Sequence, residues 1–396
     1  MKTDIFLFLF YIIFIILLRD MMITETLGDL VNYSSKSHIL TAALLICTCG
    51  FLFMQKQKFR ITYSISSILT LKRIIIVTCL ISFAWAFFEP FGSLSTYIKL
   101  ILPLFVLLFA YSIVFQIKEL KIFYILNVVL LGILLITYFQ YYQVVLMMST
   151  REQEVANSSY FLLYLLPILL CTKKKLITIG AFVTVFIAVA MSAKRGGTIA
   201  FLAGLLIYLS INHALLKNEK NKLLKLGGLI ILVLLIVNTF IGTILDGDFL
   251  IVNRLMEISD TGGSGRDKVW EKTLEMIAES DFPYFIMGHG YNQVVQDSPL
   301  KLSAHNDFLE IIYDFGIPVF CFYILFQIQM IKQIFKMMKE SSLYAAPFAF
   351  SYVTFLVNSM VSHIFIYPQY FIIYTFVWGS ILGLYHRESK INPVEH

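Results

Sequence analysis

The chain has 396 residues, of which 59% are hydrophobic and only 14% are charged. This balance is too apolar for a water-soluble domain of that length, and it predicts an all-α, polytopic integral membrane protein. The formal net charge of +6 reflects basic residues at the ends of membrane helices, so it does not indicate a nucleic-acid partner.

Apolar runs of roughly 20 residues, long enough to cross a bilayer as a helix, recur along the chain. We predict about 12 transmembrane helices. They begin near Ile5, His38, Ile74, Tyr97, Ile122, Ser158, Leu176, Gly196, Leu223, Asp307, Leu343 and Gln369. Nine of them fall within residues 1–245 and three within 307–385, before a short tail, 386–396.

Lys and Arg concentrate in every second connection between these helices, as expected of cytoplasmic connections. The pattern predicts a multi-pass protein of the bacterial inner (plasma) membrane with both termini cytoplasmic. It places the one large polar loop, residues 246–306, on the outward, periplasmic side. All 5 cysteines lie in apolar runs, which predicts no disulfide framework and no zinc site of cysteine ligands.

The outward loop contains a predicted amphipathic helix. From Arg266 to Glu279, apolar residues recur at helical spacing while charged residues occupy the other side. We expect this helix to lie along the outer membrane surface. Arg266 would occupy its first turn, where backbone N–H groups and a guanidinium favour a phosphate; the alternative is a solvated surface arginine.

Three more cations are expected on the outward side. Lys194 and Arg195 occupy a very short turn, against the usual charge distribution. A charge at membrane depth is costly and usually functional, although snorkelling to lipid headgroups is an alternative. Lys99, at the outer end of the fourth predicted helix, is a weaker case that an interfacial anchor would explain.

His305 lies where the outward loop re-enters the membrane, followed by Asp307 and Glu310. An imidazole can accept a proton near neutral pH, and an adjacent carboxylate can orient it and raise its basicity. A structural interfacial histidine is the alternative. His289 and His363 are competing bases, which we rank below His305.

Asp246 and Asp248 have the spacing of carboxylates in metal-dependent sugar transferases, but such pairs are common in turns. No other cluster has metal-ligand spacing, and neither a phosphate-binding loop nor a nucleophile elbow is present in the sequence. We therefore expect no metal, no cofactor and no nucleotide-driven chemistry.

Outward cations beside a base suit the transfer of a sugar from a lipid pyrophosphate. The donor's leaving group needs only positive charge to stabilise the departing phosphate, whereas the acceptor hydroxyl needs its proton removed or polarised. Arg195 and Arg266 could meet the first need and His305 the second.

At these residues the sequence resembles the bacterial O-antigen polymerase and O-antigen ligase family, the Wzy-like membrane glycosyltransferases. The matching positions are Ser192, Arg195, Gly265, Arg266, Trp270, Gly288, Gly290, His305 and Asn306. The resemblance implies an all-helical, GT-C-like glycosyltransferase in which the arginines bind the pyrophosphate of an undecaprenyl-linked glycan and the histidine activates the acceptor hydroxyl. Further predicted substrate-binding residues are Lys194, Lys99, Asn306, Trp270, Gly288 and Gly290.

Within the family, a polymerase joins lipid-linked repeat units, whereas a ligase moves the glycan to the lipid A core. The run from His305 to Glu310, followed by Phe315-Gly-Ile317, favours a metal-independent polymerase with lipid-pyrophosphate-linked donor and acceptor. Membrane lipid and a chain-length regulator protein are expected partners. Alternatives are a ligase, a family branch that glycosylates protein, and a lipid-linked oligosaccharide flippase, a transporter that would carry its charges at mid-membrane.

Overall fold

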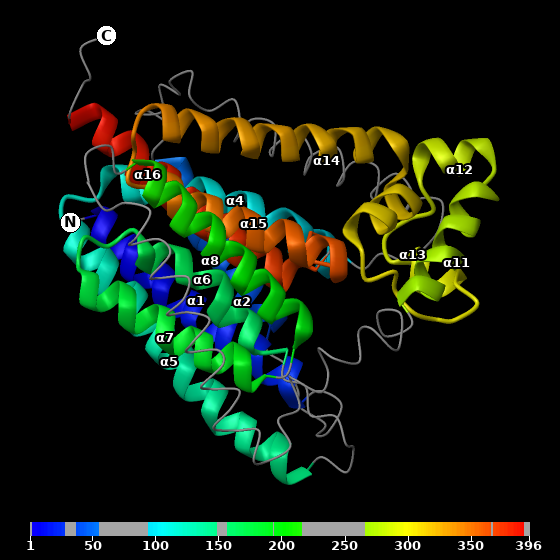
Figure 1. Ribbon diagram of the computed structural model, residues 1–396, viewed down its shortest axis with the longest axis horizontal. Helices are drawn as coiled ribbons and strands as arrows, with labels where there is room; N and C mark the ends of the chain where they lie inside the picture. Colours follow the sequence, from blue (N-terminus) through cyan, green and yellow to red (C-terminus); the bar gives the residue numbers. More distant parts are fainter. Residues whose placement is uncertain are drawn as a thin grey trace.

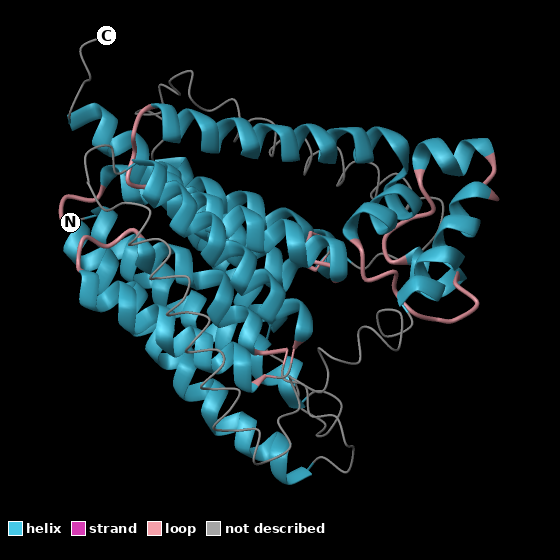
Figure 2. Ribbon diagram, in the orientation of Figure 1, coloured by secondary structure: helices cyan, strands magenta, loops and turns pink. Residues whose placement is uncertain are grey.

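The computed structural model describes residues 2–27, 37–54, 94–148, 157–192, 194–215, 266–365 and 367–391. Within these residues all the regular structure is helical (Figures 1 and 2). The helices are α1 (Lys2–Leu27), α2 (Ser37–Met54), α4 (Leu94–Gln116), α5 (Leu120–Met148), α6 (Ser159–Leu170), α7 (Lys175–Met191), α8 (Arg195–Leu215), α11 (Arg266–Ala278), α12 (Phe282–Met287), α13 (Gln293–Asp297), α14 (Asp307–Lys339), α15 (Ala345–Val361) and α16 (Pro368–Ile391).

Among the described residues, 5 helices are long and apolar enough to cross a membrane. They contain Thr3–Glu25, Ser37–Met54, Leu120–Tyr142, Arg195–Leu215 and Asp307–Lys339. Shorter apolar segments lie in α4, α6, α7 and α15. Two of the predicted helix starts, Ile74 and Leu223, lie outside the described residues, and each of the others lies at or near the start of a described helix.

The end of the chain differs from the prediction of a tail over residues 386–396. Helix α16 continues to Ile391, so the first residues of that stretch form its last turns. The end of α16 lies at the same end of the bundle as the start of α1 (Figure 1).

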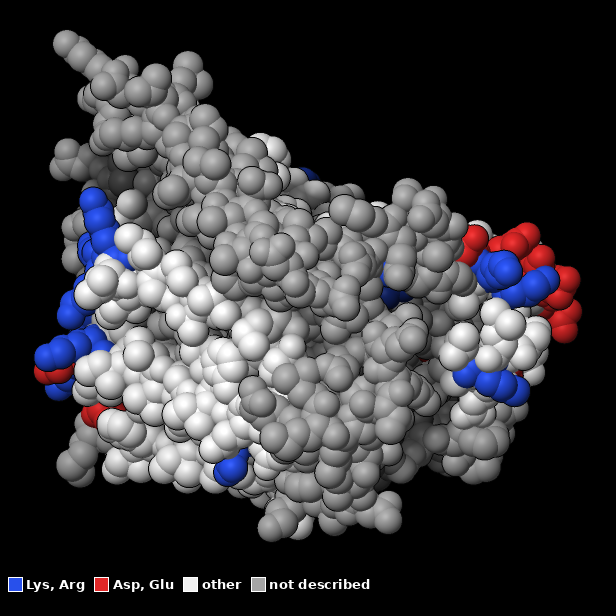
Figure 3. Space-filling view, turned by 60° about the horizontal axis from the view of Figure 1, so that its bottom comes forward, with Lys and Arg blue, Asp and Glu red and all other residues white. Residues whose placement is uncertain are grey.

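Charged side chains gather at the two ends of the molecule. Lys and Arg cluster at the end formed by the start of α1 and the end of α16, and acidic and basic side chains cover the opposite end, around α11 (Figure 3). The described surface between them is mostly uncharged, as expected of a surface that faces hydrocarbon.

Close approach of α4 and α16 organises the bundle. Gly379 and Gly383 lie one turn apart on α16 and face the α4 backbone. A Cβ at Gly379 would lie 2.4 Å from the carbonyl oxygen of Leu107, and one at Gly383 would lie 2.7 Å from that of Tyr111. Small residues at this spacing let two membrane helices pack backbone to backbone.

The described part of the outward loop folds onto the start of α14 (Figure 1). Gly316, with φ 76°, interrupts α14. The loop packs against this point because glycine has no Cβ; a Cβ at Gly316 would lie only 2.1 Å from the Ile286 carbonyl oxygen. Gly288 is equally constrained, since its Cβ would lie 2.3 Å from the Asp314 carbonyl oxygen. The Gly290 N–H donates to that same Asp314 oxygen at 2.8 Å. Of these two loop glycines, both predicted to bind substrate, Gly288 therefore has a packing role, and Gly290 has a positive φ of 111° that favours glycine.

Helix α11 occupies the stretch where sequence periodicity predicts an amphipathic helix, and it ends one residue earlier, at Ala278. Part of its apolar side packs against protein. Val269 and Thr273 are buried, and the neighbouring cluster comprises Met276, Ile277, Val294, Ala304, Leu309 and Tyr313. Leu274, on the same side of the helix, is exposed, and the position of α11 along the membrane surface stays a prediction.

Candidate functional site

Three of the predicted outward cations, Lys194, Arg195 and Arg266, and His305 come together where several helices begin. Arg195 is the first residue of α8, Arg266 is the first residue of α11, and His305 lies two residues before α14. The charges of Arg266 and Lys194 are close enough to lower the pKa of His305, and the charge of Arg195 lowers the pKa of Arg266. We call Lys194, Arg195 and Arg266 the cationic patch.

The turn between α7 and α8 positions Arg195. The buried Ser192 hydroxyl donates to the carbonyl one turn earlier in α7, at 2.6 Å. Gly196 and Gly197 then leave room for Tyr160 of α6, whose hydroxyl oxygen and ring would each lie 3.1 Å from an added Cβ. The tyrosine therefore packs directly against the start of α8.

Arg266 is half-buried, and burial is the largest cause that lowers its pKa from the ordinary value. Tyr160 raises the pKa and the neighbouring Arg195 lowers it. A guanidinium stays charged under such conditions. Like charges held together at a partly desolvated position favour an anionic ligand, which would offset their repulsion.

His305 has a backbone conformation that non-glycine residues rarely adopt, with φ 51°. Its backbone N–H donates to the Glu310 carboxylate at 3.0 Å. Burial lowers the pKa of the imidazole to about 4, and His363, Arg266 and Lys194 act in the same direction. The ring is therefore neutral near pH 7. The expectation that the adjacent carboxylate raises its basicity is wrong, because burial is the largest influence on the pKa and Glu310 binds the backbone N–H rather than the ring.

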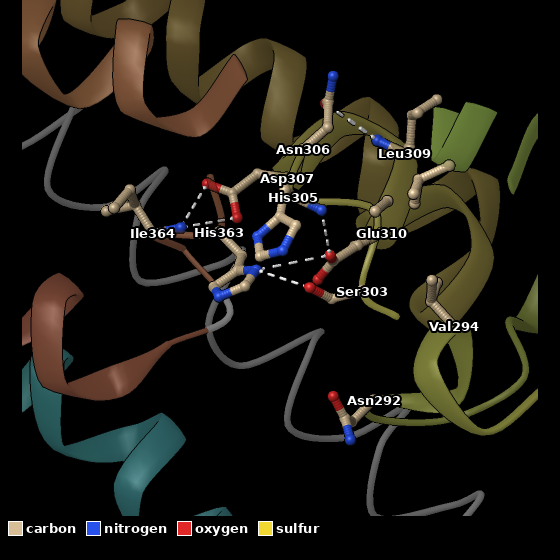
Figure 4. A network of polar contacts seen from close by, with 12 residues as sticks. Asn292, Val294, Ser303, His305, Asn306, Asp307, Leu309, Glu310, His363 and Ile364 are labelled. Carbon is tan, nitrogen blue, oxygen red and sulfur yellow. Dashed lines mark hydrogen bonds and ion pairs between the residues drawn. The ribbon is translucent and has the colours of Figure 1, made fainter. Parts of the chain in front are cut away.

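His363 lies against His305 (Figure 4). The two rings stack with centroids 4.7 Å apart and an interplanar angle of 22°. Nδ1 of His363 lies 3.2 Å from the Ser303 hydroxyl and 3.7 Å from the Glu310 carboxylate. Tyr367 stacks on the other face of His363 at 3.9 Å. The sequence ranked His363 as a competing base, and the structure places it beside the favoured one.

Asp307 fixes the turn that carries His363. Its fully buried carboxylate accepts a hydrogen bond from the Ser359 hydroxyl at 2.6 Å. It also accepts from the backbone N–H group of Ile364 at 3.0 Å (Figure 4). The backbone N–H group of Phe365 donates to it at 2.9 Å. The start of α14 therefore holds the end of α15, and with it the second imidazole.

Trp270 and Asn306 hold the backbone on either side of His305. The Trp270 indole N–H donates to the Ala304 carbonyl at 2.8 Å. The Asn306 side-chain oxygen caps α14 by accepting from the Phe308 N–H at 3.0 Å. Both residues were predicted to bind substrate. The structure gives each a positioning contact, and a substrate contact for either stays a prediction.

His289, the other competing base, has a packing environment. Its ring stacks between Tyr284 at 4.8 Å and Tyr313 at 4.0 Å. Its Nε2 lies 3.0 Å from the Ser280 hydroxyl. It thus joins α12 to α14.

Lys99 lies near the start of α4, and its side chain is outside the described part of the structure. Asp246 and Asp248 are also outside it. Within the residues that are described, no three His, Cys, Asp or Glu side chains are grouped as metal ligands would be.

Tyr160 and Glu25 lie beside the cationic patch and were not predicted from the sequence. Glu25, near the end of α1, accepts a hydrogen bond from the Asn157 side chain at 2.9 Å. Glu25 interacts electrostatically with Tyr160, and Tyr160 interacts electrostatically with Arg266. The one sequence signal for Glu25 is an isolated carboxylate at the end of an apolar run, and Tyr160 has no signal at all.

Together, the fold and the site define a polytopic membrane protein with a cationic site built from the ends of its helices. Residues 180–324 match the family model described as O-antigen ligase. The match includes the cationic patch and His305 and ends before His363. A search of curated proteins finds no match to the chain.

Proposed function

We propose that the protein is a glycosyltransferase of O-antigen assembly, acting in the bacterial inner membrane on a glycan linked to undecaprenyl pyrophosphate. The observation that carries the proposal is the cationic patch beside a neutral imidazole. An anionic leaving group and a hydroxyl nucleophile need these two features, and they need them next to each other.

In the proposed reaction, an acceptor sugar hydroxyl attacks the anomeric carbon of the donor. The new glycosidic C–O bond forms as the bond between that carbon and the pyrophosphate oxygen breaks. The pyrophosphate leaves with the bonding electron pair, and Arg195, Arg266 and Lys194 stabilise the charge that develops on it. The hydroxyl proton passes to His305, which is neutral at physiological pH and can accept it.

Binding of the donor would also change the pKa of His305. The charges of Arg266 and Lys194 help to hold the pKa of His305 at about 4 in the free protein. A bound pyrophosphate places negative charge beside these cations, so it raises that pKa towards the ordinary value of 6.5. His305 then becomes a stronger base only when the leaving group is in place.

The acceptor distinguishes two candidate activities. Our preferred reading is a polymerase, whose acceptor is a second lipid-linked glycan, and the run from His305 to Glu310 is the feature that favours it. The family match by itself supports a ligase, with lipid A core as the acceptor, equally well, because the matching family model is described as O-antigen ligase.

The test is an acceptor assay with purified protein in detergent, supplied only with lipid-pyrophosphate-linked repeat units. We expect a glycan ladder from the wild type and none from His305→Ala. His289→Phe is the matched control, because a phenyl ring keeps the stacking between Tyr284 and Tyr313, so this variant should retain the ladder. A product that forms only after lipid A core is added would identify a ligase. No product with either acceptor would reject the proposal in favour of a transporter.

A further inference from the structure

A cavity with a volume of about 690 Å³ lies at the end of the bundle opposite to the cationic patch. It is bounded by the start of α5, the turn between α6 and α7, and the last turns of α16. In Figure 1 this is the end where α1 starts and α16 finishes. The cavity is therefore separate from the site assigned to glycosyl transfer.

The walls of the cavity are apolar and continue onto the outside of the bundle. Ile125, Val128 and Val129 line it from successive turns of α5, and all three side chains are exposed. Leu120 at the start of α5, Ile177 of α7 and Leu384 of α16 add to the apolar lining. In a membrane-spanning helix such an exposed face contacts acyl chains, so the cavity opens towards lipid rather than towards the protein core.

The charged part of the lining has four basic side chains, Lys121, Lys173, Lys174 and Arg387, and one carboxylate, Glu388. Lys121, Lys173 and Lys174 are exposed, and within the described parts of the chain their ammonium groups form no hydrogen bond or ion pair. Arg387 differs, because its guanidinium donates to backbone carbonyls after α4, including that of Lys118 at 3.0 Å. Three ammonium groups therefore remain available to an anion.

We propose that this cavity binds one anionic phospholipid from the leaflet on that side of the membrane. The phosphate lies among Lys121, Lys173 and Lys174, and an acyl chain follows the α5 wall. Lysines at helix ends stand at the level of the headgroups, where clustered basic residues attract anionic lipids. A free phosphate would leave the apolar wall unused, and a neutral lipid would leave the three charges unused, so the pairing of wall and charges favours an anionic lipid.

The test uses the full-length protein, delipidated in detergent and titrated with phosphatidylglycerol or phosphatidylcholine, with bound lipid counted by native mass spectrometry. The wild type should bind one phosphatidylglycerol with a higher affinity than phosphatidylcholine. The triple variant Lys121→Gln/Lys173→Gln/Lys174→Gln should bind phosphatidylglycerol about tenfold more weakly or worse. Lys332→Gln/Lys336→Gln/Lys339→Gln is the matched control, because it removes the same charge from exposed positions at the end of α14, and its affinity should be unchanged.

A second variant keeps the proposal testable if the triple variant does not fold. Val128→Trp fills the cavity without changing charge, so it should also lose the bound phosphatidylglycerol. Equal binding of both lipids by the wild type, unchanged affinity in the cavity variants, or equal loss in the control variant would overturn the proposal. So would full competition by inorganic phosphate at the same concentration as the lipid, because that result would indicate a site for the headgroup alone.

Discussion

The two ends of the helix bundle both carry clustered basic residues, but they hold them in different physical settings. At the candidate site the cations are half-buried, and a glycine pair and buried hydrogen bonds fix the surrounding backbone. At the opposite cavity the lysines are exposed at the rim of an apolar wall. A half-buried charge beside a titratable ring can change the chemistry of that ring, whereas an exposed lysine chiefly attracts anions to a surface.

The comparison implies that substitutions at the two ends have separable effects. Changes to the cationic patch should reduce glycosyl transfer without affecting lipid retention, and changes to the cavity lysines should do the opposite. The predictions below test this separation, beginning with the largest expected effect.

Replacing Arg266 tests the role of the cationic patch in glycosyl transfer directly. Arg266→Ala should reduce the rate of glycan transfer about 100-fold to 1000-fold, because it removes a preorganised charge that would stabilise the leaving pyrophosphate. Arg266→Lys should recover part of the rate, since it keeps the charge but loses the planar fork. The measurement is product formed per unit of purified protein.

Lys268 supplies the control for Arg266, because it lies on the same helix and is exposed. Lys268→Ala should keep the wild-type rate. An equal loss of rate in both variants would mean that α11 contributes general positive charge rather than a specific arginine.

Asp307 tests whether buried hydrogen bonds assemble the site. Asp307→Ala leaves the Ser359 hydroxyl and the N–H groups of Ile364 and Phe365 without their acceptor. We expect a loss of about 3 kcal/mol in the free energy of unfolding, measured by denaturant titration in detergent. Asp307→Asn retains one acceptor oxygen and should lose less. Asp267→Ala, at an exposed position on α11, should change the free energy little, and a comparable loss there would contradict the assignment.

Much of this arrangement could be predicted from local sequence. Apolar runs are sufficient to indicate membrane helices, because a bilayer requires each span to satisfy its own backbone hydrogen bonds. Arg195 could be singled out because an outward cation departs from the usual charge distribution, and Arg266 because it begins a predicted helix, where a phosphate is favoured. His305 was identifiable because it lies where polar chain re-enters the membrane.

The rest depends on tertiary contacts that no local pattern reports. His363 lies far from His305 in sequence, and tertiary contacts, among them the Asp307 hydrogen bonds, bring its turn next to that ring. The loop glycines suggested substrate binding, but Gly288 is required where its backbone meets α14. The sequence could not show that part of the apolar side of α11 packs against protein, because periodicity shows that a face will be covered and does not show what covers it.

His363 should act by positioning His305 rather than by contacting substrate. His363→Ala removes the ring that stacks on the imidazole, and we expect about tenfold lower kcat. KM for the lipid-linked donor should stay near the wild-type value, because the cationic patch is unchanged. His363→Phe keeps a stacked ring and should restore most of kcat. A rise in KM with an unchanged kcat would instead assign His363 to donor binding.

The smallest expected effect is a shift in the pH at which kcat/KM falls on the acid side. His305 must be neutral to accept a proton, and its pKa in the free protein is about 4, so kcat/KM should fall on the acid side near that pH rather than near 6.5. Lys194→Gln removes a positive charge that lowers this pKa. The pKa then rises, and the acid limb of kcat/KM moves to higher pH. Lys268→Gln removes a charge from the exposed side of α11 and should leave the limb in place.

The same pKa fixes the sign of a stability effect. The folded protein binds the His305 proton less readily than the unfolded chain, so stability is lost as the pH falls from about 6.5 towards 4. His305→Gln should flatten that part of the profile of unfolding free energy against pH. Lys194→Gln should instead raise the lower end of the pH range over which stability is lost, because it raises the pKa of His305 in the folded protein. A wild-type acid limb near pH 6.5, unmoved by Lys194→Gln, would show that the cationic patch does not control the base. The two ends of the bundle would then no longer differ in the way proposed.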